Sequence, residues 1–138
     1  MDLPLLSETN CPPGTRLRPH EVTYTEEEIE SYGERTGERA EEYRVDGVLR
    51  VPPGLLLVQP MRLIHNNFHY ETGVHVSSDL VVHDLPSAGE TVTVGGSVVD
   101  LFERNGSKYI TFHTEVTGAD GRAHATIDHT SIYALARR

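Results

Sequence analysis

Residues 91–135 read TVTVGGSVVDLFERNGSKYITFHTEVTGADGRAHATIDHTSIYAL, and this stretch decides the fold. Asn105-Gly106 is a strong hairpin signal, because both central positions of a type I′ turn need positive φ. Asp120-Gly121 repeats the signal one strand later. Between the two turns, every second residue from Ile110 to Val116 lies on one face of a strand, which predicts one buried and one wetter face. The chain is therefore expected to fold back twice into three long antiparallel strands.

The first of these strands changes phase at Gly95-Gly96. Residues 91–94 alternate between polar and apolar side chains, and the alternation resumes only at Val98. A β-bulge inserts an extra residue and bends a strand. We therefore expect a β-bulge at the glycine pair.

The composition describes one acidic domain. The chain has 138 residues, with 21 acidic and 12 basic side chains and a formal net charge of −9. This length holds one hydrophobic core, and the absence of a basic patch makes nucleic acid and anionic membranes poor partners. A single cysteine, Cys11, excludes an internal disulfide and fits a reducing compartment. No export signal is readable and no apolar run approaches the ~18 residues of a membrane span, so we expect a cytoplasmic protein.

The N-terminal part predicts an irregular arm, a short strand and a capped helix. Residues 1–19 are rich in proline and lack periodicity, so we expect an irregular arm before a single domain at 20–138. After a strand at 20–24, Thr25 can cap a helix that carries glutamates in its first turn and stops at Gly37. One stripe of this helix holds Ile29, Tyr32, Gly33 and Thr36.

The middle of the chain predicts a buried central helix and a further strand. Residues 55–64 are the most apolar stretch, and regular helix is expected to begin near Gln59 or to kink at Pro60. Alternation then returns over residues 70–83. The residues in phase are Val74, Val76, Ser78, Leu80 and Val82.

Three segments, taken together and in this order, carry a resemblance to a known family. They are Val22 to Ile29 with the following Thr36-Gly37, the turn from Leu85 to Val92, and Asp120-Gly121-Arg122. Over residues 21–135 the chain resembles the MaoC-like (R)-specific enoyl-CoA hydratases and 3-hydroxyacyl dehydratases. The resemblance implies an α+β hotdog fold, in which an antiparallel sheet wraps around a central apolar helix. It also implies an acyl-thioester substrate carried by coenzyme A or acyl carrier protein, with no other cofactor.

The acid–base pair of that family is replaced here. The hydratases carry Asp-x-Asn-Pro-x-His after Thr-Gly, and Glu38 and Tyr43 stand at the aspartate and histidine positions. The resemblance therefore implies Glu38 and Tyr43 as catalytic residues. A glutamate can act as a general base, whereas a tyrosine titrates near pH ~10 and at neutral pH is a hydrogen-bond donor. The family's His-Gly step is Pro53-Gly54 here, which implies that Gly54 binds substrate through its backbone N–H.

Two histidines near the end of the central helix form a second candidate group. His65 and His69 stand four residues apart, the spacing that places two imidazoles on one helical face. Since no carboxylate completes a His-Glu-x-x-His motif, no metal site is predicted. Either the two histidines interact favourably with the helix dipole, or they line a pocket shared between two hotdog subunits.

Three functions are compatible with a chain that keeps the three family segments but has a different acid–base pair. The first is a divergent hydratase or dehydratase that uses Glu38, with a histidine from elsewhere. The second is a non-catalytic acyl-binding domain or partner subunit. The third is a hotdog thioesterase, for which Glu71 and Asp79 are the candidate carboxylates. All three imply a homodimer or a paired hotdog subunit, because one sheet wrapped on one helix leaves edge strands open.

Overall fold

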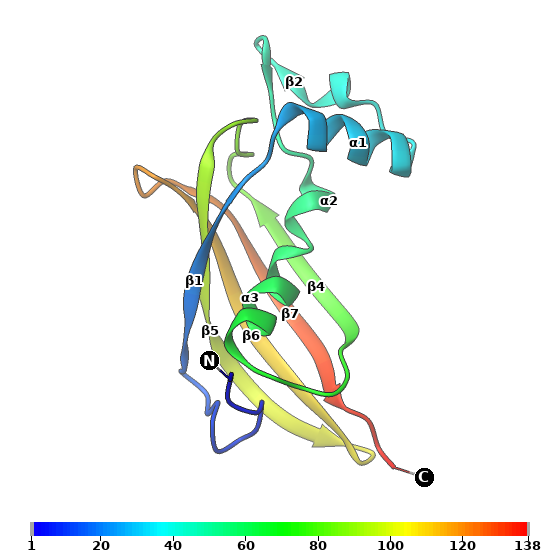
Figure 1. Ribbon diagram of the computed structural model, residues 1–138, viewed down its shortest axis with the longest axis vertical. Coiled ribbons are helices and arrows are strands. Elements are labelled where there is room, and N and C mark those ends of the chain that lie inside the picture. Colours follow the sequence, from blue (N-terminus) through cyan, green and yellow to red (C-terminus); the bar gives the residue numbers. More distant parts are fainter. Residues whose placement is uncertain (1, 138) are drawn as a thin grey trace.

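A curved antiparallel sheet wraps around a central helical segment in the computed structural model, which describes residues 2–137 (Figure 1). The strand order is β1-β5-β6-β7-β4, so β1 and β4 are the edges. The strands are β1 (Arg16–Thr23), β4 (Val74–Val82), β5 (Thr91–Arg104), β6 (Ser107–Gly118) and β7 (Ala123–Ala134). No helix within the described residues has the length and apolar character needed to cross a membrane.

Both predicted hairpins are present. Asn105 and Gly106, between β5 and β6, have φ angles of 51° and 82°, and Gly121, between β6 and β7, has a φ of 84°. The alternation of β6 is also confirmed, because every second residue from Ile110 to Val116 is buried and the residues between them are half-buried or exposed. The buried positions that the sequence predicted are Ile110, Phe112, Thr114 and Val116.

The irregularity predicted at the glycine pair is present only toward β1, where Leu17 pairs with Gly96 and His20 with Val94, so the extra residue lies on β1. Gly95-Gly96 stays in register with β6, and the irregularity in that ladder falls between Val98 and Asp100. Gly96 has another role, since a Cβ there would collide with the backbone carbonyl of His113 on the neighbouring strand. The interrupted alternation did not locate the extra residue of β5, because a glycine has no side chain that shows which face of the strand it occupies.

The first helix, α1 (Glu26–Thr36), begins and ends where the sequence predicts. The Thr25 hydroxyl accepts a hydrogen bond of 3.1 Å from the Glu28 N–H, and Gly37 closes the helix with a φ of 79°. A 3-10 turn, η1 (Ala40–Tyr43), and a small hairpin of β2 (Arg44–Val45) and β3 (Val48–Leu49) follow. With α1 they lie beyond one end of the large sheet (Figure 1).

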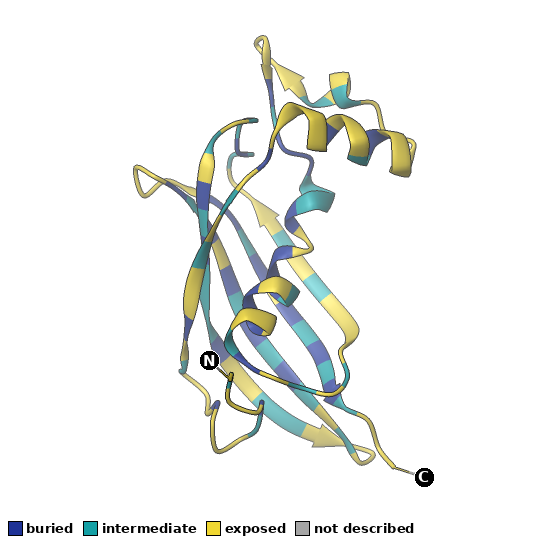
Figure 2. Ribbon diagram, viewed as in Figure 1, coloured by how far each residue is buried: buried dark blue, intermediate teal, exposed yellow. Residues whose placement is uncertain are grey.

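The central helix consists of two pieces, α2 (Pro53–Leu56) and α3 (Gln59–Asn67). Regular helix resumes at Gln59, as predicted, and Pro60 lies in the first turn, where its missing N–H removes no helical hydrogen bond. Leu56, Leu63 and Ile64 are buried in the core between helix and sheet. Figure 2 shows the buried residues gathered on the concave face of the sheet beneath this helix.

The N-terminal arm is shorter than predicted and is packed against the domain. β1 begins at Arg16 rather than at His20, so the end of the predicted arm belongs to the sheet. Leu6 is buried, and its N–H donates to the carbonyl of His69 at 2.8 Å. The His69 N–H in turn donates to the carbonyl of Pro4 at 2.8 Å. The arm therefore covers the end of α3.

Candidate active site

The loop after α1 folds back onto the helix at Gly33, which is buried. A Cβ at this position would collide with the backbone carbonyl of Glu38 and would lie 3.5 Å from the amide nitrogen of Ala40. Only glycine permits this approach without a shift of the loop. Gly33 therefore fixes the path by which the chain leaves Gly37 and enters η1.

Glu38 and Tyr43, the two predicted catalytic residues, lie together on this loop. The Tyr43 hydroxyl donates a hydrogen bond of 2.7 Å to Oε2 of Glu38. This hydrogen bond, with a smaller effect of burial, raises the pKa of Tyr43 to about 12. Tyr43 is therefore protonated at neutral pH, so it orients the carboxylate and does not act as a base. The carboxylate of Glu38 is exposed, and its Oε1 accepts no hydrogen bond from residues 2–137, so it can accept one from water or a ligand.

A second phenol, that of Tyr32 in α1, lies against Gly54 of α2. A Cβ on Gly54 would collide with the Tyr32 hydroxyl and would lie 3.0 Å from Cζ of that ring. The proximity of Tyr32 also contributes to the raised pKa of Tyr43. Sequence reasoning missed Tyr32, since it lies on the packing stripe of α1. The available signal was its position one turn before the Thr36-Gly37 end of the helix, where the site loop begins.

An open cavity of about 560 Å³ borders Glu38. Its walls come from α1 and the loop that follows, and the carboxylates among the lining residues are Glu30, Glu34, Glu38 and Glu41. Arg39 is the basic residue in the same lining. The rim is therefore strongly acidic, which opposes the approach of another anion to this side of the site.

His65 lies near the end of α3 and His69 follows that helix, and α3 is separated from α1 by α2 along the molecule (Figure 1). Both histidines line a cavity of about 480 Å³ together with Asp2, Leu3 and Phe68. Nδ1 of His65 lies 3.3 Å from the Tyr70 hydroxyl. Within one chain the structure does not bring these histidines to Glu38, and a role in a pocket shared between subunits stays a prediction. In residues 2–137 no three His, Cys, Asp or Glu side chains form a group that could hold a metal ion.

The two carboxylates considered for thioesterase chemistry lie apart from the Glu38 cluster. Asp79 is exposed on β4 opposite Asp128 of β7, whose carboxylate accepts a 2.7 Å hydrogen bond from the half-buried His113. Its neighbour Ser78 points to the other face of the sheet, so Asp79 faces solvent, away from the central helix. Glu71 lines a cavity of about 190 Å³ beside the N-terminal arm.

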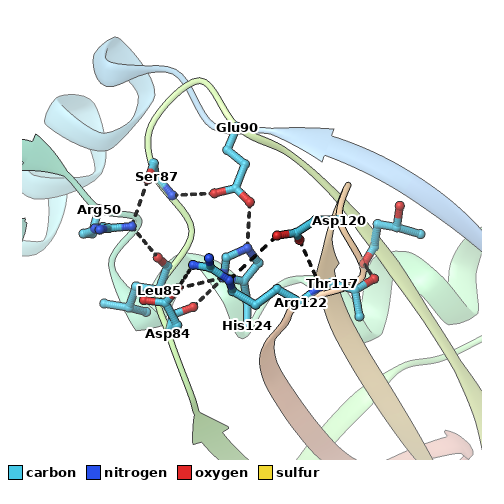
Figure 3. A network of polar contacts seen from close by, with 10 residues as sticks. Arg50, Asp84, Leu85, Ser87, Glu90, Thr117, Asp120, Arg122 and His124 are labelled. Atoms are coloured by element: carbon cyan, nitrogen blue, oxygen red, sulfur yellow. Dashed lines mark hydrogen bonds and ion pairs between the residues drawn. The ribbon is translucent and has the colours of Figure 1, made fainter.

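A polar network that the sequence did not predict fixes the loop between β4 and β5 (Figure 3). His124 of β7 is buried, and its Nε2 lies 2.7 Å from a carboxylate oxygen of Glu90. Its Nδ1 lies 2.6 Å from the backbone carbonyl of Asp84. Arg122 donates a 2.8 Å hydrogen bond to the Asp84 carboxylate, which lowers the pKa of that carboxyl. The imidazole of His124 thus joins β7 to both ends of the loop between β4 and β5.

The same loop supports the start of the central helix. Arg50 donates hydrogen bonds to the Ser87 hydroxyl at 2.9 Å and to the Leu85 carbonyl at 3.3 Å (Figure 3). The Val51 N–H donates to the Pro86 carbonyl at 2.8 Å. The turn from Leu85 to Val92, which carries part of the family resemblance, therefore holds the segment that leads to Gly54.

Comparison with solved structures confirms the fold. The chain is similar to the monoamine oxidase regulatory protein from Archaeoglobus fulgidus, with 15% identity, 99% of each chain covered and a TM-score of 0.79. It is similar to a MaoC-like dehydratase from Rhodospirillum rubrum, with 13% identity, coverage of 96% of this chain and 99% of the other, and a TM-score of 0.72. It is also similar to a chain of the HadBC (3R-hydroxyacyl-ACP dehydratase) complex from Mycobacterium tuberculosis, with 13% identity, coverage of 87% and 96%, and a TM-score of 0.73.

These similarities establish the fold of the chain and do not establish its activity. The chain has the α+β hotdog fold, shared with MaoC-like dehydratases. No protein-family model and no curated protein matches the sequence. At such low identity a shared fold does not transfer an activity, so the function is argued from the site.

Proposed function

We propose that the protein is a divergent MaoC-like hydratase or dehydratase that acts on an acyl thioester through Glu38. The observation that carries the proposal is the 2.7 Å hydrogen bond from the Tyr43 hydroxyl to the Glu38 carboxylate. It joins the two positions at which the family that this chain resembles carries its acid–base pair. Tyr43 holds one carboxylate oxygen, and the other remains available for water. Glu38 is then the acid–base residue, and Tyr43 is a positioning residue.

One carboxylate can carry both proton transfers of a hydration. Glu38 takes a proton from water as the water oxygen bonds to C3 of a trans-2-enoyl thioester. The π electrons of the C2–C3 bond move toward the thioester carbonyl, and the protonated Glu38 then delivers its proton to C2. The carboxylate is regenerated and one water has been added; dehydration is the reverse.

The thioester carbonyl needs a hydrogen-bond donor, because it gains negative charge in this step. The N–H of Gly54 lies in the first turn of α2, where a backbone N–H has no acceptor within the helix. Gly54 is therefore the proposed substrate-binding residue.

Coenzyme A and acyl carrier protein both present an anionic phosphate. The acidic rim formed by Glu30, Glu34 and Glu41 favours entry of either carrier from another side.

The active unit proposed here is a pair of hotdog subunits joined along β4. An unpaired edge strand presents free N–H and C=O groups to another chain. In β4 these groups are accompanied by exposed valines: Val74 is 39% exposed, Val76 49%, Val81 53% and Val82 40%. A second copy of this chain, or another hotdog subunit, would continue the sheet and cover them.

The test is hydration of crotonyl-CoA and of a longer trans-2-enoyl-CoA, followed by the loss of enoyl absorbance. We expect Glu38→Gln to lower kcat by about 10²-fold or more, the usual effect of losing a general base. Tyr43→Phe should lower kcat less, because the carboxylate remains but loses its orientation. Glu34→Gln, in the same cavity lining, is the matched control and should retain the wild-type rate. A Glu38→Gln variant with wild-type turnover would refute the assignment.

A second candidate is a non-catalytic acyl-binding or partner subunit. The observation in its favour is that the family's histidine position holds Tyr43, whose pKa is raised to about 12. This candidate predicts saturable binding of an acyl-CoA by wild type, measured by titration calorimetry, without turnover in the hydration assay. The binding should be unchanged in Glu38→Gln.

A further inference from the structure

The hydroxyl of Tyr32 is a hydrogen-bond donor without a protein acceptor in residues 2–137, in a side chain that is only half-buried. The other two phenols of this region are engaged. Tyr24 donates to the Leu55 carbonyl at 3.1 Å and accepts from the Gln59 amide at 2.5 Å. Tyr43 donates to Glu38. Of the three phenols, only that of Tyr32 makes no hydrogen bond to residues 2–137, and its half-buried hydroxyl is open to water or to a ligand.

The Tyr32 hydroxyl points at one particular place in the fold. It lies against Gly54, in the space that the Cβ of any other residue would fill. The same ring is close enough to Tyr43 to affect the pKa of that phenol. The phenol of Tyr32 therefore lies between Gly54 at the start of the central helix and Tyr43 of the Glu38 loop.

We propose that Tyr32 is a catalytic residue, which donates a hydrogen bond to the carbonyl oxygen of the bound acyl thioester. The proposal rests on the proposed function, since it uses the same site and the same substrate class. When the water oxygen bonds to C3, the electron pair of the C2–C3 double bond moves toward this carbonyl oxygen. The Tyr32 O–H stabilises the charge without losing its proton, and the charge disappears when Glu38 delivers a proton to C2.

This role explains why Gly54 carries no side chain. An alanine at Gly54 would displace the Tyr32 hydroxyl or be displaced by it. The glycine therefore allows a backbone N–H and a phenolic O–H to approach the same substrate oxygen. Two donors at one oxygen form the usual arrangement for stabilising an oxyanion.

The first readout is turnover. Loss of a single oxyanion donor lowers kcat by about 10²–10³-fold, and Tyr32→Phe is expected to show a loss of this order with a small change in KM. Tyr109→Phe is the matched control, because Tyr109 stacks on Phe102 in the β5–β6 ladder, away from the site. Circular dichroism should report the same fold for both variants.

The second readout does not require turnover. Bound 4-dimethylaminocinnamoyl-CoA, an enoyl thioester whose absorption moves to longer wavelength when its carbonyl is polarised, is measured in a Glu38→Gln background. We expect a red shift that is largely lost when Tyr32→Phe is added, with similar affinity, and that is retained with Tyr109→Phe. This loss supports the Tyr32 contact even where wild type shows no hydration; in that case the proposed function and the catalytic role of Tyr32 fail, and the contact with the thioester carbonyl stands.

Three results would overturn the proposal. An unchanged red shift in Tyr32→Phe refutes the contact while leaving an active wild-type enzyme explained by Glu38. A rate in Tyr32→Phe equal to that of wild type refutes the catalytic role. Absence of saturable binding of the cinnamoyl thioester to wild type refutes both the Tyr32 contact and the acyl-thioester site.

Discussion

The buried imidazole of His129 predicts a sheet that loses stability in mild acid. His129 is 1% exposed on β7, and its Nδ1 lies 3.1 Å from the Ser78 hydroxyl. Its Nε2 meets the Ser131 hydroxyl, and the ring stacks on His75 with 4.7 Å between centroids. Burial, with a smaller effect of His75, lowers the pKa of His129 to about 4. The imidazole is therefore neutral in the folded protein down to that pH.

The size of the stability loss follows from the difference in the protons bound by the folded and the unfolded chain. Between pH 6.5 and about 4 the unfolded chain protonates His129 and the folded chain does not, so stability falls as the pH falls. Each pKa unit corresponds to about 1.4 kcal/mol. A pKa lowered from 6.5 to about 4 thus removes about 3 kcal/mol of stability at pH 4 relative to pH 7. Domains of this kind have a free energy of unfolding of about 5–15 kcal/mol, so the loss is measurable.

The assay is urea unfolding followed by far-UV circular dichroism at several pH values between 7 and 4. Wild type is compared with His129→Gln, which removes the titrating group, and with His83→Gln, which changes an exposed histidine at the end of β4. We expect wild type and His83→Gln to lose about 3 kcal/mol more than His129→Gln over this range. Equal losses in wild type and His129→Gln would refute the reasoning.

Two further predictions concern the site loop and the edge strand. Gly33→Ala places a Cβ against the Glu38 carbonyl, so the loop must shift; kcat for enoyl-CoA hydration should fall by about 10²-fold, and Glu34→Ala on the same helix should leave it unchanged. Val76→Lys with Val81→Lys adds charge to the exposed edge of β4, so sedimentation velocity should detect a monomer where wild type is a dimer, with unaltered circular dichroism. A dimeric double variant would contradict pairing through β4.

The strands β5 to β7 were predictable from sequence because their signals are local. A type I′ turn at Asn105-Gly106 and a two-residue alternation depend only on neighbouring residues. The burial of β4 was not predictable in this way. The register of β4 against β7 shifts between His75 and Ser77, so His75 takes the face of Ser78 and the predicted phase is lost at Val74 and Val76. Val82 remains exposed on an edge strand, which has a neighbour on one side only. Its environment depends on what lies beside the sheet.

The residues of the candidate site that belong to a sequence motif were predictable. The residues that meet through contacts between distant parts of the chain were not. Glu38 and Tyr43 are five positions apart, and their family positions indicated a pair. Tyr32 and Gly54 belong to different helices, and helical periodicity assigns Tyr32 to a packing stripe. The position of His65 relative to Glu38 is likewise set by the whole length of the central helix, which no local pattern encodes.

Two glycines connect the fold to the proposed chemistry. Glycine within a helix lowers stability by about 0.5–1 kcal/mol relative to alanine, so Gly33 in α1 and Gly54 in α2 each weaken the helix that contains them. In both places the missing Cβ is replaced by a group of the candidate site, the Glu38 carbonyl in one and the Tyr32 hydroxyl in the other. In the site that we propose, Glu38 supplies the carboxylate, and the N–H of Gly54 and the hydroxyl of Tyr32 supply the hydrogen-bond donors for an acyl thioester.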